Sequence, residues 1–241
     1  MSFSSFAELY DHINGRAYQP YSEYLVSAFE KADITVREVL DLGCGTGGIC
    51  AELADKGFDM VALDISPEML NFARERNFGK NTLLLCQDMR EFELYGTVQA
   101  VYSSFDCINY LTEDGDLQTV FELVHNYLER GGVFAFDVNS EYRYTNVFDG
   151  KSFVYEVEDD MAVWRNAFSS EDKICVFDID IFSMLKNGKY IRTSENQFQR
   201  LYSRSEIIEA AKGFELVEVS GGKGFDGCEK AEKEYYIFKR I

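Results

Sequence analysis

The sequence predicts an α/β fold: a mostly parallel sheet of seven strands with helices on both faces, and an antiparallel β insertion after the fifth strand. Two observations predict it. From residue 38 onward, short apolar runs alternate with amphipathic segments, as in strands and helices of a parallel sheet. Over residues 140–202 this rhythm stops, and within that segment apolar Phe177, Ile179 and Ile181 alternate with Asp178 and Asp180. A length of 241 residues accommodates both parts, so we expect one domain over residues 1–241.

The N-terminal segment, residues 1–35, is predicted to be helical and rich in aromatic residues. Pro20 can occupy the first turn of a helix, and apolar residues from Tyr21 onward recur at helical spacing. Farther along, Ser66 and Pro67 supply an N-cap and a first-turn proline for another helix. The first four strands are expected at residues 39–42, 60–64, 82–86 and 100–103.

The middle of the chain continues the alternation and then departs from it. Residues 117–128 have the spacing of an amphipathic helix, which we expect to end at Gly131-Gly132 before a fifth strand at residues 133–138. Within the insertion, Asn187-Gly188 predicts a tight hairpin that leads into residues 190–201. After the insertion we expect a helix at residues 205–211 and strands at 214–219 and 234–239.

The composition disfavours several classes of function. The formal net charge is −18 at pH 7, and so acidic a surface repels phosphate backbones, which argues against a nucleic-acid partner. The six cysteines include no C-x-x-C pair and only two histidines are present, so we expect no metal site and no structural disulfide. Residues 1–10 lack a signal-peptide pattern, and no apolar stretch approaches the ~18 residues of a membrane span. We therefore expect a reduced, cytoplasmic protein with no membrane partner.

A glycine-rich loop carries the clearest chemical signal: residues 39–48 read VLDLGCGTGG. Glycines between a strand end and a helix start let the backbone turn sharply and approach a ligand. The spacing fits both G-x-G-x-x-G, the dinucleotide fingerprint, and G-x-G-x-G. Asp64 follows about 20 residues on, at the end of the next predicted strand, where a carboxylate can bind ribose hydroxyls in either case. The glycines alone leave a nicotinamide dinucleotide and S-adenosylmethionine as candidate ligands.

Asp41 helps to decide between these two candidate ligands, because it lies at the strand end just before the loop. A carboxylate there repels a pyrophosphate but suits the ammonium and sulfonium groups of S-adenosylmethionine. In addition, residues 87–89 (QDM) follow the third predicted strand, where a polar side chain and the backbone can meet an adenine edge. The electrostatics therefore favours S-adenosylmethionine.

These motifs, in this order, resemble the class I S-adenosylmethionine-dependent methyltransferases, which have a Rossmann-like fold, and the resemblance covers most of the chain. The family's first motif resembles residues 41–47 (DLGCGTG), its acidic ribose residue resembles Asp64, and its adenine-side motif resembles residues 87–90 (QDMR). Residues 6–11 (FAELYD) and 103–111 (SSFDCINYL) further resemble small bacterial methyltransferases with a β insertion, including amino-sugar N,N-dimethyltransferases.

The resemblance implies a cofactor site with few indispensable catalytic side chains. The sulfonium of the donor is already activated, so the protein chiefly aligns the nucleophile and excludes water. The expected cofactor-binding residues are Gly43, Cys44 and Gly45 in the loop, Asp41 toward the amino group, Asp64 on the ribose, Ile65, Asp88 and Met89 around adenine, Ser103 and Ser104 near the methionine moiety, and Tyr10 and Tyr18 as a lid.

Tyr110 is the candidate catalytic side chain. It stands where some amino-sugar enzymes have a histidine, so the resemblance implies no histidine base here. A tyrosine can orient an acceptor or accept its proton, although a phenol with a pKa of about 10 is a poor base at neutral pH. The insertion leaves the fifth strand at the ligand-binding edge of the sheet, so we expect it to cover the acceptor pocket, with Trp164, Arg165, Tyr190 and Arg200 as candidate lining residues.

The expected function is transfer of a methyl group from S-adenosylmethionine to a nitrogen or oxygen nucleophile of a small molecule. A nicotinamide-dependent oxidoreductase and a non-catalytic S-adenosylmethionine-binding interaction protein are the alternatives, because donor motifs predict binding and not turnover. The expected partner is the small-molecule acceptor, and the sequence leaves open a homodimer through the insertion.

Overall fold

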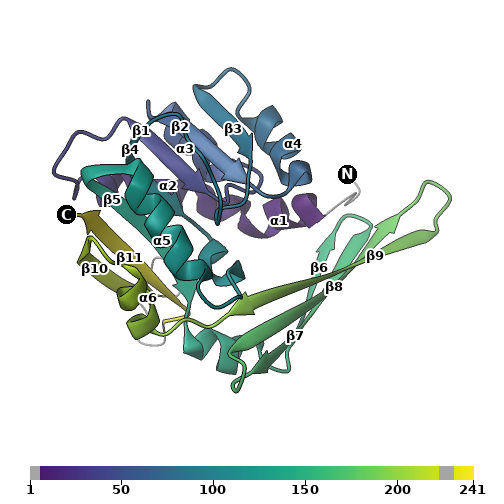
Figure 1. Cartoon of the computed structure of the whole chain (residues 1–241). Coiled ribbons are helices and arrows are strands. Elements are labelled where there is room, and N and C mark those ends of the chain that lie inside the picture. The colour runs from purple at the N-terminus through teal and green to yellow at the C-terminus, as the bar shows by residue number, and fades with distance from the viewer. Residues whose placement is uncertain (1–5, 223–230) are drawn as a thin grey trace.

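The computed structural model describes residues 6–222 and 231–241. Sheet A has seven strands in the order β10-β11-β5-β4-β1-β2-β3 (Figure 1). The strands from β5 to β3 in this order are parallel to their neighbours, whereas β11 is antiparallel to both β5 and β10. The predicted seven-stranded, mostly parallel sheet is confirmed. Its strands are β1 (Glu38–Leu42), β2 (Asp59–Asp64), β3 (Thr82–Cys86), β4 (Val98–Ser103), β5 (Leu128–Asn139), β10 (Phe214–Gly222) and β11 (Lys233–Arg240).

Helices cover both faces of sheet A because apolar side chains leave each strand on alternate sides. On β1, Val39 packs with Leu25 and Leu53 of α2 and α3, whereas Leu40 packs on the other face in the cluster that holds α5 and α6. The predicted proline falls in the first turn of α2, and the Ser66 hydroxyl caps α4. The helices are α1 (Phe6–Asn14), α2 (Tyr18–Phe29), α3 (Gly48–Asp55), α4 (Pro67–Arg76), α5 (Asp116–Tyr127) and α6 (Arg204–Ala210).

The expected boundary between α5 and β5 is wrong. The helix ends at Tyr127 and β5 begins at Leu128, so Gly131-Gly132 lies inside the strand instead of ending the helix. A Cβ atom on Gly132 would lie 2.6 Å from the carbonyl oxygen of Gln99 in β4. The glycine is therefore required by the close approach of two strands, a cause that helical periodicity does not reveal.

The predicted insertion after the fifth strand is a second sheet, sheet B, with four antiparallel strands in the order β6-β7-β8-β9. It follows a helical turn, η3 (Arg143–Phe148), and projects from the carboxyl end of sheet A beside α1 (Figure 1). Gly188, with φ +75°, lies in the predicted turn between β8 and β9. The strands are β6 (Ser152–Val157), β7 (Asp160–Ser169), β8 (Ile174–Met184) and β9 (Tyr190–Arg200).

A buried ionic network connects the carboxyl ends of the central strands. The Lys233 ammonium of β11 lies 2.5 Å from a carboxylate oxygen of Asp106, after β4, and 2.5 Å from one of Asp137 in β5. The hydroxyl of Tyr21 in α2 also donates to Asp137. Phe105 and Asp106 both have φ of +55°, so this network holds a strained turn in place.

None of the helices in the described residues has the length and apolar character needed to cross a membrane. Within the same residues, no three His, Cys, Asp or Glu side chains gather in the way that a metal site requires. The cysteines at positions 44, 50, 86, 107 and 175 are free thiols, and Cys228 lies outside the described residues.

Candidate active site

A cavity of about 460 Å³ lies at the carboxyl end of sheet A, bounded by α1 and by sheet B. It opens beside β1 and β4, where the strand order of the sheet reverses and ligands bind in open α/β sheets. We call its two parts the loop end and the insertion end. The loop end is lined by Gly43, Gly45, Asp64, Ile65, Asp88 and Met89, and the insertion end by Tyr110, Arg143, Phe148, Phe153, Tyr155, Trp164, Asn166, Phe177, Glu195 and Gln197.

The glycine loop turns through conformations that other residues rarely adopt. Gly43 and Gly45 have φ of +80° and +53°. A Cβ atom on Gly43 would lie 2.1 Å from the Cys107 sulfur, so a side chain cannot be accommodated without a shift. The backbone N–H groups of Gly43 and Cys44 both donate to the carbonyl oxygen of Leu63, at 2.9 Å each. The loop is thereby fixed against the end of β2.

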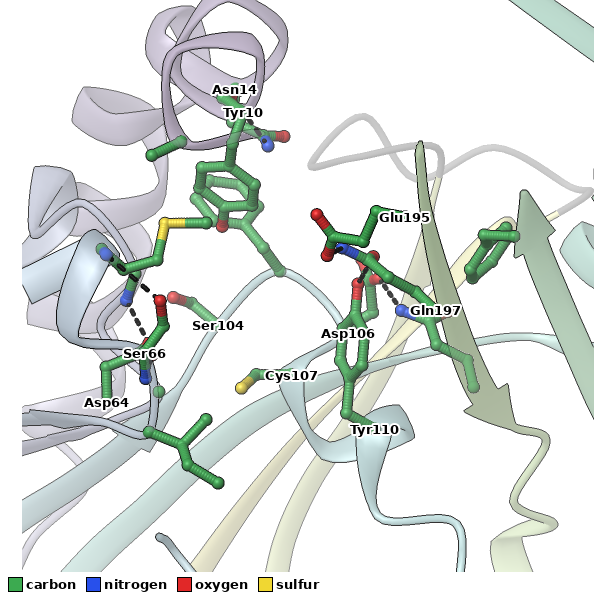
Figure 2. A pocket seen from close by; sticks show the side chains of 18 of the residues that line it. Tyr10, Asn14, Asp64, Ser66, Ser104, Asp106, Cys107, Tyr110, Glu195 and Gln197 are labelled. Atoms are coloured by element: carbon green, nitrogen blue, oxygen red, sulfur yellow. Dashed lines mark hydrogen bonds between the residues drawn. The ribbon is translucent and has the colours of Figure 1, made fainter. Parts of the chain in front are cut away.

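Asp64 is held by the backbone at the end of β2. One carboxylate oxygen accepts a hydrogen bond from the Gly45 N–H and the other from the Ser66 N–H, both at 2.8 Å (Figure 2). Burial raises the pKa of Asp64, and these two hydrogen bonds oppose that rise. The neighbouring Ile65 side chain is 64% exposed and lines the cavity, where an apolar ring could cover it.

Asp41 lies directly beneath the loop, with only 1% of its surface exposed, and does not line the cavity. Tyr102 donates to one of its oxygens at 2.6 Å, whereas the other oxygen, Oδ1, is buried without a hydrogen-bond partner among the described residues. Burial and the nearby charge of Asp64 raise the pKa of Asp41 to about 8, against the lowering effect of the Tyr102 hydrogen bond. A cation bound nearby would stabilise the ionised form of this carboxylate.

Asp88 and Met89 both line the loop end after β3, as the adenine-side motif implies. An ion pair with Arg90, with 2.5 Å between nitrogen and oxygen, lowers the pKa of Asp88. The Met89 methyl group would lie 3.3 Å from a Cβ atom on Gly43, so the apolar side chain adjoins the loop.

Other predicted cofactor residues divide between the cavity and the structure behind it. Tyr10 and Ser104 line the cavity (Figure 2). The structure does not bring Tyr18, Cys44 or Ser103 to its wall.

The reasons that Tyr18 and Ser103 lie behind the cavity wall are local. The Tyr18 hydroxyl donates to Asp11 at 2.7 Å, and its ring fills the space above Gly48, so it braces α2 instead of forming a lid. The buried Ser103 hydroxyl donates to the carbonyl oxygen of Leu42 at 2.8 Å.

Tyr110 lies at the insertion end, where its side chain faces β9 (Figure 2). Its hydroxyl donates to Oε1 of Gln197 at 2.7 Å, and Nε2 of Gln197 donates to Glu195 at 2.7 Å. Enclosure by the surrounding protein, with the nearby charge of Asp106, raises the pKa of Tyr110 above its ordinary value. The pKa of Tyr110 therefore lies above neutral pH, and its hydroxyl is a hydrogen-bond donor in this structure.

Only one of the four residues expected in the insertion lines the cavity. Trp164 does so, whereas the adjacent Arg165 leaves β7 on the opposite face and pairs with Asp178 and Asp180. Successive residues of a strand point to opposite faces, so Trp164 and Arg165 cannot both reach the same cavity.

Tyr190 and Arg200 share the outer face of sheet B with Arg165. Arg200 pairs there with Asp114 and Glu206. The expectation that Arg165, Tyr190 and Arg200 line the pocket is wrong, because side chains alternate along each strand and these three lie on the face away from the cavity.

Sequence reasoning missed four polar residues of the insertion end: Arg143, Asn166, Glu195 and Gln197. The signal for Asn166 was available, because it lies two residues after Trp164 and so shares its face. Glu195 and Gln197 required the pairing register, in which they lie opposite Ile179 and Phe177 of β8. Arg143 belongs to a helical turn that the sequence pattern did not predict.

The loop, the carboxylate at the end of β2 and the acidic group beneath the loop together define a site for an adenosyl methyl donor. Residues 39–132 match the family model of the methyltransferase domain. The chain is also 32% identical to "Putative methyltransferase YqeM" of Bacillus subtilis (strain 168), over 99% of this chain and 96% of that protein. The protein belongs to the S-adenosylmethionine-dependent methyltransferases, and S-adenosylmethionine is its cofactor.

The chain is also similar to two further methyltransferases. A crystal structure of an S-adenosylmethionine-dependent methyltransferase from Clostridium acetobutylicum ATCC 824 is similar, with a TM-score of 0.85 and 27% identity over 98% of this chain and 97% of that one. A dTDP-3-amino-3,6-dideoxy-alpha-D-glucopyranose N,N-dimethyltransferase of Streptomyces fradiae is 32% identical over 48% of this chain and 46% of that protein. The resemblance to methyltransferases that include amino-sugar enzymes is confirmed, and the nicotinamide alternative is set aside.

The residues present fit this cofactor. The unpartnered oxygen of Asp41 belongs to a buried carboxyl group beneath the loop, and the ionised form of that group would complement a donor with a positive sulfonium and an ammonium group. Gly43 and Gly45 line the cavity without side chains, so their backbone is open to a ligand there.

Proposed function

We propose that the protein transfers the methyl group of S-adenosylmethionine to a nitrogen or oxygen nucleophile of a small molecule bound at the insertion end. The observation that carries this proposal is the cavity, which joins the loop end to the inner face of sheet B within about 460 Å³. A volume in this range suits small ligands (typical pockets measure about 300–1,000 Å³). The net charge of −18 adds an argument against a nucleic-acid acceptor.

The loop end would hold the donor, whose sulfonium supplies an electrophilic methyl group when bound. Asp64 would accept hydrogen bonds from the ribose hydroxyls, because its carboxylate is already oriented by two backbone N–H groups. Ile65 and Met89 would pack against the adenine ring. Asp41 would stabilise the positive charge of the donor from beneath the loop, through its charge or through water.

The insertion end would hold and align the acceptor. Tyr110 would position the nucleophile by a hydrogen bond, in keeping with a phenol that stays protonated at neutral pH. The aromatic side chains of sheet B would exclude water from the transfer path, which is the main task left to a protein when the cofactor is already activated.

The experiment that tests this proposal has two stages. Calorimetric titration with S-adenosylhomocysteine should give saturable binding, and Asp64→Ala should weaken it. Labelled S-adenosylmethionine should then transfer its methyl group to members of a panel of small amines and hydroxy compounds. Binding of the donor without transfer to any small molecule, together with transfer to protein or RNA, would refute the proposal.

A further inference from the structure

Two polar side chains at the insertion end have hydrogen-bonding capacity that the protein does not use. Asn166 is 5% exposed and lines the cavity, and neither its Oδ1 nor its Nδ2 has a hydrogen-bond partner among the described residues. Arg143 is half-buried and also lines the cavity, and its buried Nε lacks a partner in the same part of the chain. A buried polar group without a hydrogen bond is energetically unfavourable, so these groups point to a ligand.

The two side chains surround one aromatic surface. Asn166 of β7 lies directly opposite Phe177 of β8, and Phe177 lies opposite Gln197 of β9, so the three share a face of sheet B. Phe177 packs edge-on against Phe148, with 5.3 Å between ring centroids. The guanidinium of Arg143 lies 4.9 Å from the Phe148 centroid.

The Arg143 guanidinium makes no direct contact with a carboxylate in the described residues. No ion pair within 4.0 Å joins it to an acidic side chain there, and Asp106, which also lines the cavity, instead pairs with Lys233 and accepts from Gln199. The charges of Arg143 and Asp106 act on each other at longer range, because Arg143 helps to lower the pKa of Asp106, but the guanidinium has no direct ion-pair partner among the described residues. The neighbouring amide of Asn166 offers one donor and one acceptor group beside it.

A guanidinium presents its N–H groups as a planar fork that matches the two oxygens of a carboxylate or phosphate. We propose that the methyl acceptor is an oxyacid, whose carboxylate or phosphate binds Arg143 and Asn166 while its nucleophile lies toward Tyr110. This inference rests on the proposed function and adds the chemical class of its acceptor.

The pairing register also limits the length of that acceptor. Tyr110 donates to Gln197, which lies in the same row of sheet B as Asn166. Two strand spacings of about 4.8 Å separate the backbones of Asn166 and Gln197. The anion and the nucleophile are therefore expected within roughly 10 Å of each other.

The test uses full-length protein saturated with S-adenosylhomocysteine and three probes that share a phenyl group: phenylacetate, phenyl phosphate and 2-phenylethanol. Ligand-observed NMR titration should show that at least one anionic probe binds tenfold or more tightly than the neutral alcohol. Arg143→Gln and Asn166→Leu should each weaken the anion at least tenfold and leave the alcohol within twofold. Asn166→Asp should weaken the anion further by charge repulsion.

The control variants are Arg37→Gln, whose exposed side chain pairs with Asp59 away from the cavity, and Asn196→Leu, on the exposed face of β9. Neither should change the affinity for any probe. Unchanged S-adenosylhomocysteine affinity in every variant establishes that the fold and the loop end are intact.

Each outcome has a defined meaning for the inference. Tighter binding of phenylacetate assigns a carboxylic acid, and tighter binding of phenyl phosphate assigns a phosphate ester. Equal binding of all three probes, or retention of the anion by both Arg143→Gln and Asn166→Leu, overturns the oxyacid inference and leaves the methyl-transfer proposal intact. Failure of the wild type to methylate any small molecule would instead overturn the proposed function.

Discussion

The two ends of the cavity are built in different ways. At the loop end, hydrogen bonds within the protein already hold the polar groups of the cavity wall: Asp64 accepts from two backbone N–H groups, and the Leu63 carbonyl accepts from two others. Among the described residues of this end, only Asp41, behind that wall, has an unpartnered buried oxygen. At the insertion end, Asn166 and Arg143 have buried polar atoms that the described residues leave unpartnered. The loop end is preorganised by its backbone. At the insertion end, a ligand would complete the hydrogen bonds.

This difference predicts a separation of effects. Changes at the loop end should act on donor affinity, and changes at the insertion end should act on the acceptor while donor affinity is preserved. The following variants test that separation, beginning with the largest expected effect.

Gly43→Ala should abolish donor binding. The substitution forces a side chain into a φ of +80° and places its Cβ 2.1 Å from the Cys107 sulfur. Backbone strain and overpacking together should lower the free energy of unfolding by about 2–5 kcal/mol. Calorimetry should show a loss of S-adenosylhomocysteine affinity of more than about 100-fold, equivalent to about 2.7 kcal/mol.

Gly57→Ala is the matched control, because Gly57 has φ of +95° but no atom within 4 Å of the added Cβ. It should cost only the backbone strain, about 1–2 kcal/mol, and leave donor affinity unchanged. Wild-type donor affinity in Gly43→Ala would contradict the close contact between Gly43 and the Cys107 sulfur on which this prediction rests.

Asp64→Ala should weaken S-adenosylhomocysteine binding by about 10- to 150-fold, the range expected when a hydrogen bond to a charged group is lost. The Gly45 and Ser66 N–H groups would also lose their acceptor. Calorimetry measures the effect, and Asp59→Ala, at the opposite end of β2, is the control. Equal losses in the two variants would indicate damage to the strand and not to the site.

Asp41 should make donor affinity depend on pH. Its pKa is raised to about 8, and a cationic donor favours the ionised form, so S-adenosylmethionine affinity should increase as pH rises toward 8. The gain is at most about tenfold per pH unit, and it levels off above pH 8. Calorimetry from pH 6 to 9 measures the slope, which Asp41→Asn should reduce.

The same raised pKa has the opposite consequence for folding. The unfolded carboxyl releases its proton near pH 4, whereas the folded one retains it up to about pH 8. The free energy of unfolding should therefore decrease as pH rises through that window. Urea titrations of wild type and Asp41→Asn should converge at low pH, and parallel curves would argue against this titration.

Tyr110→Phe should have the smallest effect, and only on the acceptor. Loss of one neutral hydrogen bond should lower kcat/KM for the acceptor by about 2- to 12-fold, with S-adenosylhomocysteine affinity within twofold of wild type. Steady-state kinetics with the acceptor found by the panel measures this. A loss beyond 100-fold with an altered pH profile would instead identify Tyr110 as the base.

The sequence predicted which residues meet at the loop end, because that geometry depends on residues close together in the chain. A strand, the glycine loop and Asp64 lie within one βαβ unit, so spacing alone predicts their juxtaposition. Tyr18 behaves differently. Its position in the sequence permitted a lid, but its hydroxyl donates to Asp11 and the side chain does not line the cavity. Side-chain partners of this kind do not follow from helical periodicity.

The insertion end was predicted as a location but not as a set of residues. The alternation over residues 177–181 indicated antiparallel strands, yet it did not show which face would meet the cavity. Trp164 and Arg165 were both expected there, and only one of two adjacent strand residues can be. Choosing between them required the docking of sheet B on α1, through contacts of Leu9 with the sheet's apolar face.

The alternation of sheet B has an evolutionary consequence. Every second residue on its four strands lies on the face toward the cavity, and those that line the cavity are separate in sequence from the residues of the loop end. Substitutions such as those at Asn166 or Gln197 could therefore change the compound that is methylated without altering the source of the methyl group. Proteins with this fold could therefore acquire new substrates through substitutions on the cavity-facing side of sheet B alone.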